Sequence, residues 1–138
     1  MKNVLVIYYT QSGQLHEIAN QIAKPFLNDK AIDLTFHEIK LKKPFPFPWD
    51  NDSFFGAFPE SFLQIPSDLE PVPTEILEKK YDLILFHYQV WYLSPSIPIT
   101  SFLKSEEAKI LLDNTPTITI SGSRNMWIMA QEKVKTLL

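Results

Sequence analysis

Three short polar segments of the sequence carry residue types that can bind a phosphate or a flat ring. Each follows an apolar stretch, and they span residues 10–15, 88–95 and 121–125. In the first segment Thr10 and Ser12 offer hydroxyls, and Gly13 lets a backbone approach a ligand closely. A helix that begins here carries partial positive charge at its first N–H groups, so a phosphate cradle needs no Lys or Arg. The alternative is an ordinary helix start that is capped by a hydroxyl.

The other two segments and the histidines offer further candidates. Trp91 is either a stacking partner for a flat ring or a core anchor, because large aromatic side chains are mostly buried. Arg124 could bind an anion or a carbonyl oxygen of a substrate, or form a surface ion pair. We expect His87 to be a hydrogen-bonded core residue, His16 to be solvated and His37 to lie at the surface. Since the histidines share no ligand spacing with a carboxylate, we predict no metal site.

Alternating strands and helices must position these segments. Residues 3–9 and 81–88 are apolar on both alternating faces, which is typical of strands covered by helices on both sides. Residues 32–39 alternate with period two and 115–121 are rich in threonine, so both are expected to be strands. We expect helices at 15–26, 74–80, 97–112 and 127–138, and a loop at 89–95. The pattern predicts an α/β doubly wound parallel sheet, in which ligands bind at the carboxyl ends of the strands.

Residues 41–73 interrupt this pattern with an insertion that is rich in proline and phenylalanine. It holds seven of the eleven prolines and six of the ten phenylalanines. Proline denies the segment regular hydrogen bonding, and its aromatic side chains are too many for a free linker. The insertion is either a flap that completes the core or, over residues 45–62, a lid on a ligand pocket. Both can hold.

Length and charge exclude several classes of function. The chain has 138 residues, 13 Lys plus Arg against 16 Asp plus Glu, a net charge of −3 and no cysteine. The length fits a single domain spanning residues 1–138. The balance of charge argues against a nucleic-acid partner, and no apolar run approaches the roughly 18 residues of a membrane span. No secretory leader opens the chain, so we expect a cytoplasmic protein.

Two of the polar segments resemble those of flavodoxin-like proteins. Thr10-Gln-Ser-Gly-Gln-Leu15, directly after an apolar strand, is similar to the flavodoxin FMN-phosphate motif Thr-x-Thr/Ser-Gly-x-Thr. Tyr88-Gln-Val-Trp-Tyr-Leu-Ser-Pro95, followed by Phe102-Leu103, resembles the aromatic loop after the third strand of flavodoxin-like reductases. The resemblance implies the strand order 2-1-3-4-5, with FMN at the point where the strand order reverses.

The resemblance also implies the residues that would form the cofactor site. The FMN phosphate would be held by Thr10, Gln11, Ser12, Gly13 and Gln14, with Leu15 where the motif has its last threonine. The ring would be bordered by Tyr88, Gln89, Val90, Trp91 and Tyr92. Ser121, Gly122, Ser123 and Arg124 would complete the site, with Arg124 as the candidate catalytic residue. Because Leu15 lacks a hydroxyl and Tyr92-Leu93 is bulky, the alternative is a flavodoxin fold without FMN.

A second resemblance concerns the substrate. Pro44-Phe-Pro-Phe-Pro-Trp49, Phe58-Pro-Glu-Ser-Phe62, the Trp91 segment and Arg124-Asn-Met-Trp-Ile-Met-Ala-Gln131 are similar to bacterial dialkylresorcinol condensing enzymes. That family implies oxidation of a cyclic diketone to an aromatic resorcinol in aryl-lipid biosynthesis, beside a separate ketosynthase partner. Thioester condensation ordinarily needs a thiolate, and this chain has no cysteine. Hydride removal by a flavin fits the residues better.

The expected function is therefore that of an FMN-dependent oxidoreductase acting on a small cyclic diketone or quinone-like ring. A scaffold that lacks FMN and supports a biosynthetic complex is the alternative, and an electron carrier is the third. We expect four strands in the order 2-1-3-4, with the fifth strand missing from a C-terminally truncated domain. The fourth strand would keep an unpaired edge, which favours a homo-oligomer.

Overall fold

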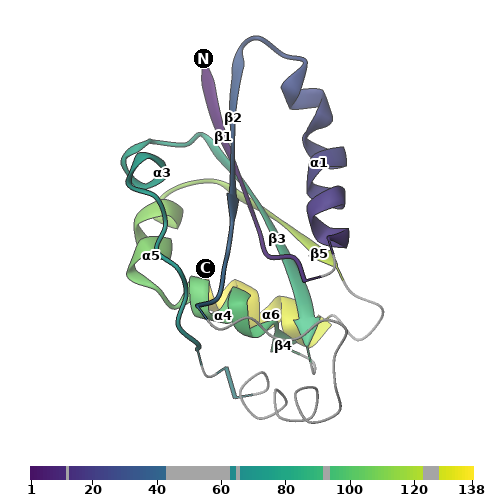
Figure 1. Ribbon diagram of the computed structural model, residues 1–138, viewed down its shortest axis with the longest axis vertical. Helices are drawn as coiled ribbons and strands as arrows, with labels where there is room; N and C mark the ends of the chain where they lie inside the picture. Colours follow the sequence, from purple (N-terminus) through teal and green to yellow (C-terminus); the bar gives the residue numbers. More distant parts are fainter. Residues whose placement is uncertain (12, 43–62, 65, 92–93, 123–127) are drawn as a thin grey trace.

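A parallel β-sheet forms the centre of the protein, and the computed structural model describes residues 1–11, 13–42, 63–64, 66–91, 94–122 and 128–138 (Figure 1). The parallel strands are β1 (Lys2–Tyr8), β2 (Ile32–Glu38), β3 (Leu83–Trp91) and β5 (Thr117–Gly122), in the order β2-β1-β3-β5. The predicted α/β class and the order of the four parallel strands are confirmed. Since all four strands run in one direction, their carboxyl ends meet at one end of the sheet, toward the bottom of Figure 1.

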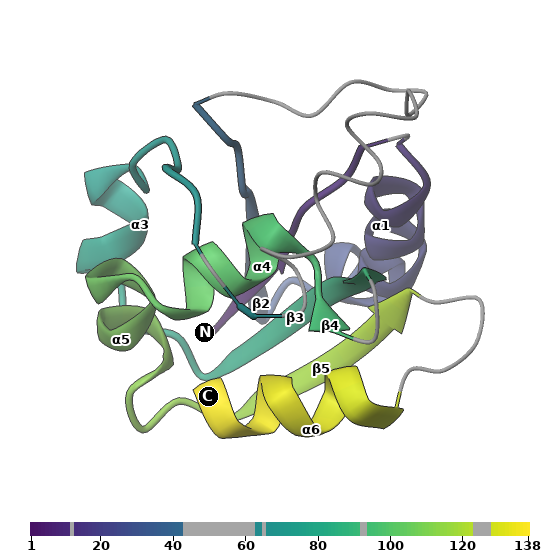
Figure 2. The ribbon, with the colours of Figure 1, turned by 90° about the horizontal axis from the view of Figure 1, so that it is seen from below.

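Helices cover both faces of this sheet (Figure 2). They are α1 (Gln14–Leu27), α3 (Thr74–Glu78), α4 (Ile97–Leu103), α5 (Glu106–Leu112) and α6 (Ile128–Leu137). On one face Val4, Val6 and Leu85 pack against Ala19 and Ala23 of α1. On the other face, alternate residues of β1 and β3 join α4, α5 and α6 in a larger core of Leu5, Ile7, Ile84, Phe86, Tyr88, Ile99, Phe102, Leu111 and Val134. The continuous apolar sequences of β1 and β3 therefore reflect burial on both faces, as predicted.

The prediction of a loop over residues 89–95 is wrong in part. Strand β3 continues to Trp91, and a two-residue strand, β4 (Ser94–Pro95), turns back and pairs antiparallel with its end, Val90 opposite Pro95. Among the described residues the sheet thus has five strands, one more than the four predicted, and the additional strand is β4. A proline at this position is tolerated because it lies on a short strand at the margin of the sheet.

The single helix predicted over residues 97–112 is also wrong, because two helices fill this range. All seven residues of α4 are buried, whereas α5 buries only Ala108 and Leu111. Ser105 separates the two helices in an extended conformation, and its hydroxyl accepts a hydrogen bond from the N–H of Ala108 at 3.1 Å. This cap starts α5 in a new direction, and the apolar pattern alone does not reveal it.

The described ends of the 41–73 insertion pack on the α4 and α5 side of the sheet. Residues 40–42 and 68–70 run antiparallel, with an isolated bridge between Leu41 and Leu69. The N–H of Val72 then donates to a carboxylate oxygen of Glu107 on α5 at 2.6 Å. Val72 itself lies in the core. Residues 43–62 are outside the described residues, so the predicted lid over 45–62 stays a prediction.

Removing the Ser105 cap should weaken the protein. We expect Ser105→Ala to lower the free energy of unfolding by about 1 kcal/mol, because the N–H of Ala108 loses its acceptor. Ser105→Thr, which keeps a hydroxyl that can accept from Ala108 and donate to the carbonyl of Phe102, serves as the control and should stay close to the parent protein. Denaturant titration followed by circular dichroism measures both, and equal losses for the two variants would contradict the capping role.

Candidate functional site

The first polar segment forms a tight turn between β1 and α1. The N–H of Gly13 donates to the hydroxyl of Thr10 at 2.9 Å, and the carbonyl of Gly13 accepts from the N–H of Glu17 at 3.1 Å. Gly13 has a φ of 90°, in the left-handed region that favours glycine. The turn therefore directs the start of α1, with its first-turn N–H groups, toward the carboxyl end of β1.

The space beside Gly13 is open. A Cβ atom at this position would meet no other heavy atom within 4 Å, among the residues that the structure describes. No acidic or basic side chain belongs to residues 10–15, and the nearest charged residue along the helix is Glu17. A ligand that binds here would therefore depend on hydroxyls, on backbone N–H groups and on the helix dipole.

Leu15 joins the first and third polar segments. Its side chain is 5 % exposed, and a Cβ atom at position 122 would lie 3.1 Å from its Cδ1 atom. A larger residue at position 122 would therefore need the Leu15 side chain to shift by a few tenths of an ångström. The position where the flavodoxin motif has a threonine is used here for packing the end of β5 against the start of α1.

Gln89 joins the first and second segments. Its side-chain amide donates to the carbonyl of Tyr9, and its amide oxygen accepts from the hydroxyl of Ser96 at 3.2 Å. The N–H of Ser96 donates back to the carbonyl of Gln89 at 2.9 Å. This half-buried side chain therefore fixes the end of β1 to the chain that follows β4. Tyr9 and Ser96 were not among the predicted site residues; for Ser96, a serine directly before a helix was the available signal.

An aromatic pair borders the same region. Trp91 meets Tyr9 edge to face, with ring centroids 6.3 Å apart and an angle of 83° between the planes. Burial, with Glu38 as a lesser cause, raises the pKa of Tyr9 above its ordinary value, so its hydroxyl stays neutral at physiological pH. Trp91 and Val90 are half-buried and lie at the margin of the core. Both alternatives for Trp91 therefore remain open, because a half-buried indole can anchor the core and still contact a ligand.

The remaining predicted site residues lie in different surroundings. Tyr88 is 1 % exposed, and burial raises its pKa while a hydrogen bond with Ser121 opposes that shift. Tyr88 therefore supports the site from within the core rather than from its surface. Thr10 and Gln11 are half-buried, while Gln14 and Ser121 are exposed. The predictions for Ser12, Tyr92, Ser123 and Arg124 fall outside the described residues.

Two of the three histidines are buried and one is exposed. The prediction that His37 lies at the surface is wrong: it is 8 % exposed beside Phe102, because the alternation of β2 turns it toward α4. Burial lowers its pKa, with Glu107 as an opposing cause. His87 is fully buried, with Nδ1 3.4 Å from the carbonyl of Ile7, as predicted for a core histidine. His16 is exposed and stacks on Tyr8.

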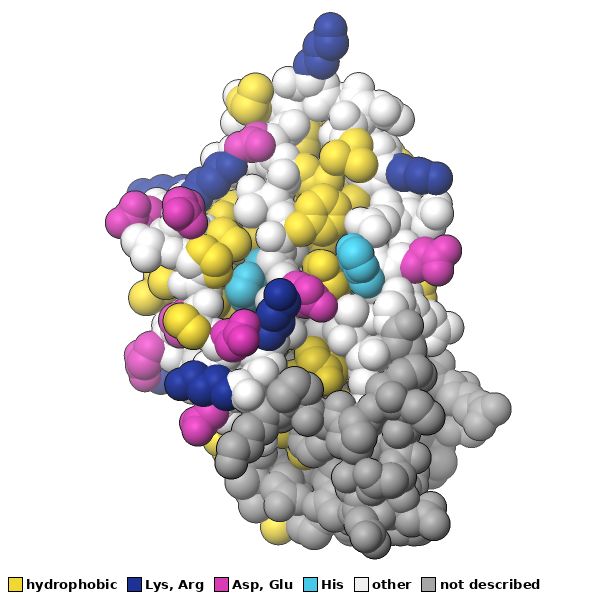
Figure 3. Space-filling view, in the orientation of Figure 1, with side chains coloured by type: hydrophobic (Ala, Val, Ile, Leu, Met, Phe, Trp, Pro, Cys, Tyr) yellow, Lys and Arg dark blue, Asp and Glu magenta, His cyan; other side chains and the backbone are white. Residues whose placement is uncertain are grey.

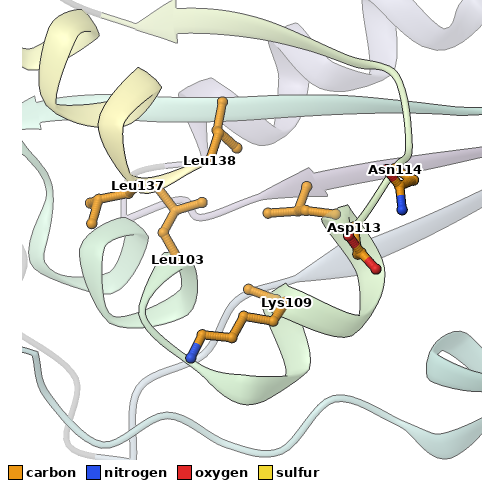
Figure 4. A pocket seen from close by; sticks show the side chains of 8 residues that line it. Leu103, Lys109, Asp113, Asn114, Leu137 and Leu138 are labelled. Atoms are coloured by element: carbon orange, nitrogen blue, oxygen red, sulfur yellow. The ribbon is translucent and has the colours of Figure 1, made fainter.

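A pocket of about 360 Å³ lies elsewhere, between α4, α5 and α6 (Figure 4). Leu103, Leu137 and Leu138 line one side of it, and Asp113 and Asn114 line the other. None of its lining residues belongs to the three polar segments. Within the described ranges, no group of three or more His, Cys, Asp or Glu side chains could hold a metal ion, and no helix is long and apolar enough to cross a membrane.

Comparison with solved structures defines the class of fold. The chain is similar to a protein of Bacteroides eggerthii DSM 20697 that is provisionally assigned as a flavoprotein, with a TM-score of 0.74 and 14% identity over 99% of this chain and 80% of the other. It is also similar to a flavoprotein of Lactobacillus acidophilus NCFM in complex with FMN, with a TM-score of 0.58 and 19% identity over 99% of both chains. The chain thus has a flavodoxin-like α/β fold.

The comparisons go no further than the fold. No protein-family model matches the sequence. No curated protein matches it either. At 14% and 19% identity the similarity concerns the fold. The comparisons do not support the resemblance to dialkylresorcinol condensing enzymes.

Acidification should destabilise the protein through its buried histidines. Burial lowers the pKa of His87 below the ordinary value of 6.5, so the unfolded chain binds a proton below that pH and the folded chain does not. The free energy of unfolding should therefore decrease as the pH falls below about 6.5. The Nε2 atom of His87 is buried without a hydrogen-bond partner among the described residues. His87→Leu removes this proton acceptor and should reduce the loss of stability.

Urea unfolding at about pH 7.5 and about pH 5 measures this difference. The loss on acidification should be smaller in His87→Leu than in the parent protein. An equal loss in the two proteins would show that the pKa of His87 is not lower in the folded chain than in the unfolded chain.

Proposed function

We propose that this protein binds FMN at the carboxyl ends of β1 and β3 and acts as an FMN-dependent oxidoreductase. The observation that carries the proposal is Gly13, which has a φ of 90° at the start of α1 and an added Cβ of which would meet no heavy atom of the described residues within 4 Å. This position is the point where the strand order reverses, since β1 leads outward to β2 and then across to β3. Ligands of doubly wound sheets bind there. The likeness to a flavoprotein in complex with FMN supports the proposal.

The phosphate end of FMN fits the described residues. The helix start beyond Gly13 supplies N–H donors, and no carboxylate lies within residues 10–15 to repel a dianion. The hydroxyl of Thr10 accepts from the N–H of Gly13 and holds the turn in shape, so the N–H groups of the first turn of α1 are the ones that would contact the ligand. Thr10, Gln11, Gly13 and Gln14 would hold the phosphate.

The ring of the flavin would lie against the second segment. Gln89, Val90 and Trp91 are half-buried where β3 ends, beside the buried ring of Tyr9. A flat apolar wall with a few fixed polar groups is typical of cofactor sites. When bound, FMN supplies the hydride or electron transfer. The chain's own residues bind and orient it and exclude water from one side.

The substrate class follows from the sequence resemblance. We propose a small cyclic diketone or quinone-like ring, as in the oxidation of a cyclic diketone to a resorcinol, with a ketosynthase as the possible partner. The apolar side chains of the 41–73 insertion suit such a ring, and Arg124 would bind its carbonyl oxygen.

A second candidate function has one specific observation in its favour. Leu15 removes a hydroxyl from the phosphate motif and is committed to packing against Gly122. A flavodoxin fold that supports a biosynthetic complex without FMN would tolerate that change. The two functions differ in one measurable property, which is FMN binding.

Titration of the protein with FMN and with riboflavin separates these functions. We expect saturable quenching of flavin fluorescence, with FMN binding at least tenfold more tightly than riboflavin, because riboflavin lacks the phosphate that the start of α1 would bind. A tenfold difference corresponds to about 1.4 kcal/mol. Failure of FMN to bind would favour the scaffold. Equal affinities would mean that the phosphate makes no contact with the turn.

Substitution of Gly13 tests the location of the phosphate. Gly13→Val should abolish FMN binding, since a β-branched residue is strained at a φ of 90° and would occupy the open space. Gly13→Asn is the sharper variant, because asparagine tolerates this backbone conformation and so preserves the turn. We expect it to weaken FMN at least tenfold and to leave riboflavin affinity unchanged. Undiminished FMN affinity in Gly13→Asn, with a normal unfolding curve, would rule out phosphate binding at this turn.

A further inference from the structure

One lysine of α6 lies at the border of the helix face that packs on the core. Ala130 and Val134 are buried and Leu137 packs against the core, so the spacing of these residues defines the inward face. Lys133 follows Ala130 by three positions, which places it beside that face, and it is half-buried. On the side of the molecule seen in Figure 3, by contrast, several lysine side chains project from the surface. A half-buried ammonium group needs a polar partner within the protein.

The partner of Lys133 is a serine of β4. The ammonium group of Lys133 donates to the hydroxyl of Ser94 at 2.8 Å. Ser94 is fully buried, and α6 packs against the two-residue strand to which it belongs. A buried hydroxyl needs a hydrogen-bond partner, and a bond from a charged donor is stronger than one between neutral groups. Lys133 therefore holds β4 against α6.

Ser94 lies opposite Trp91 in the antiparallel pair of β3 and β4. The second residue of β4, Pro95, has no N–H group, so few backbone hydrogen bonds can hold this short strand. The bond from Lys133 adds a side-chain contact to the residue that faces Trp91. The ring of Trp91 in turn meets that of Tyr9 edge to face. The position of Trp91 therefore depends on Tyr9 and on the residue that Lys133 holds.

The same bond connects parts of the chain that carry the polar segments. Helix α6 follows the third segment in the chain, and Trp91 ends β3 within the second. Gln89 connects the first segment with the second, and Leu15 connects it with the third. Lys133 supplies the remaining connection, between the second segment and the helix that follows the third.

We propose that Lys133 is a positioning residue of the flavin site, which through Ser94 holds Trp91 where its indole borders the flavin ring. The role rests on the proposed function, because it assigns Trp91 to the ring. It requires no contact between Lys133 and the cofactor. Since Gly13 would act on the phosphate and Lys133 on the ring, the loss of Lys133 should weaken flavins with and without a phosphate alike.

Lys133→Met removes the ammonium group and keeps most of the side-chain length. We expect FMN and riboflavin both to bind about fivefold more weakly or worse, with the ratio of their affinities unchanged, because Ser94 loses a charged donor. Lys133→Arg keeps such a donor and should bring both affinities to within about twofold of the parent protein. Lys135→Met is the control, since Lys135 is exposed on the same helix and pairs with Glu132 at 3.2 Å.

The indole N–H signal of Trp91 in the ¹H–¹⁵N spectrum of the flavin-free protein measures the positioning itself. Trp91→Phe identifies this signal among those of the three tryptophans. Lys133→Met and Ser94→Ala should each displace it, and the double variant should displace it no further, because both changes remove the same hydrogen bond. A lysine that only stabilised the fold would lower the free energy of unfolding without displacing the signal. Ser94→Ala keeps the test decisive if Lys133→Met does not fold.

The possible failures of this role and of the proposed function are distinct. An unchanged indole signal in folded Lys133→Met, or an equal displacement in Lys135→Met, would overturn the role of Lys133. Unchanged flavin affinities in folded Lys133→Met, beside a parent protein that binds FMN, would overturn that role alone. A parent protein that binds neither FMN nor riboflavin would overturn the proposed function and the role of Lys133 with it.

Discussion

Strand β1 lies between β2 and β3, and the arrangement of the candidate site follows from this position. Because the strands are parallel, this order places the turn after β1 next to the end of β3. Gln89 fixes the two ends together through Tyr9 and Ser96, and Leu15 fixes the third segment to the first through Gly122. The described parts of three segments that are far apart in the sequence are thus held together at one end of the sheet by strand order and two side chains.

The elements that could be predicted from the sequence are those whose pattern is set by burial. Strands β1 and β3 are apolar on both faces because helices cover both, and the glycine of the first turn marks a backbone conformation that other residues avoid. These two features sufficed to predict the class of fold and the first polar segment, whereas the strand order was predicted from the resemblance to flavodoxin-like proteins. The roles of the site residues stay predictions, and Ser12, Tyr92, Ser123 and Arg124 lie outside the described residues.

The features that could not be predicted depend on contacts between distant residues. A two-residue strand such as β4 has no pattern of its own and exists because the end of β3 offers it backbone partners. The apolar pattern of residues 97–112 predicts one helix, whereas the structure has a break at Ser105. The break is recognised only from the hydrogen bond between the Ser105 hydroxyl and the N–H of Ala108. His37 is buried because the alternation of β2 turns it toward the face that α4 and α5 cover. The sequence of β2, which lies at the margin of the sheet, does not indicate which of its two faces is covered.

The proposed flavin site lies where the first turn and the end of β3 meet. The most direct test is the change in ¹H–¹⁵N chemical shifts of the uniformly labelled protein during titration with FMN. We expect the largest changes at the backbone amides of Gly13 and Leu15 and at the indole N–H of Trp91. Changes confined to the pocket between α4, α5 and α6, around Leu103 and Ala108, would contradict it.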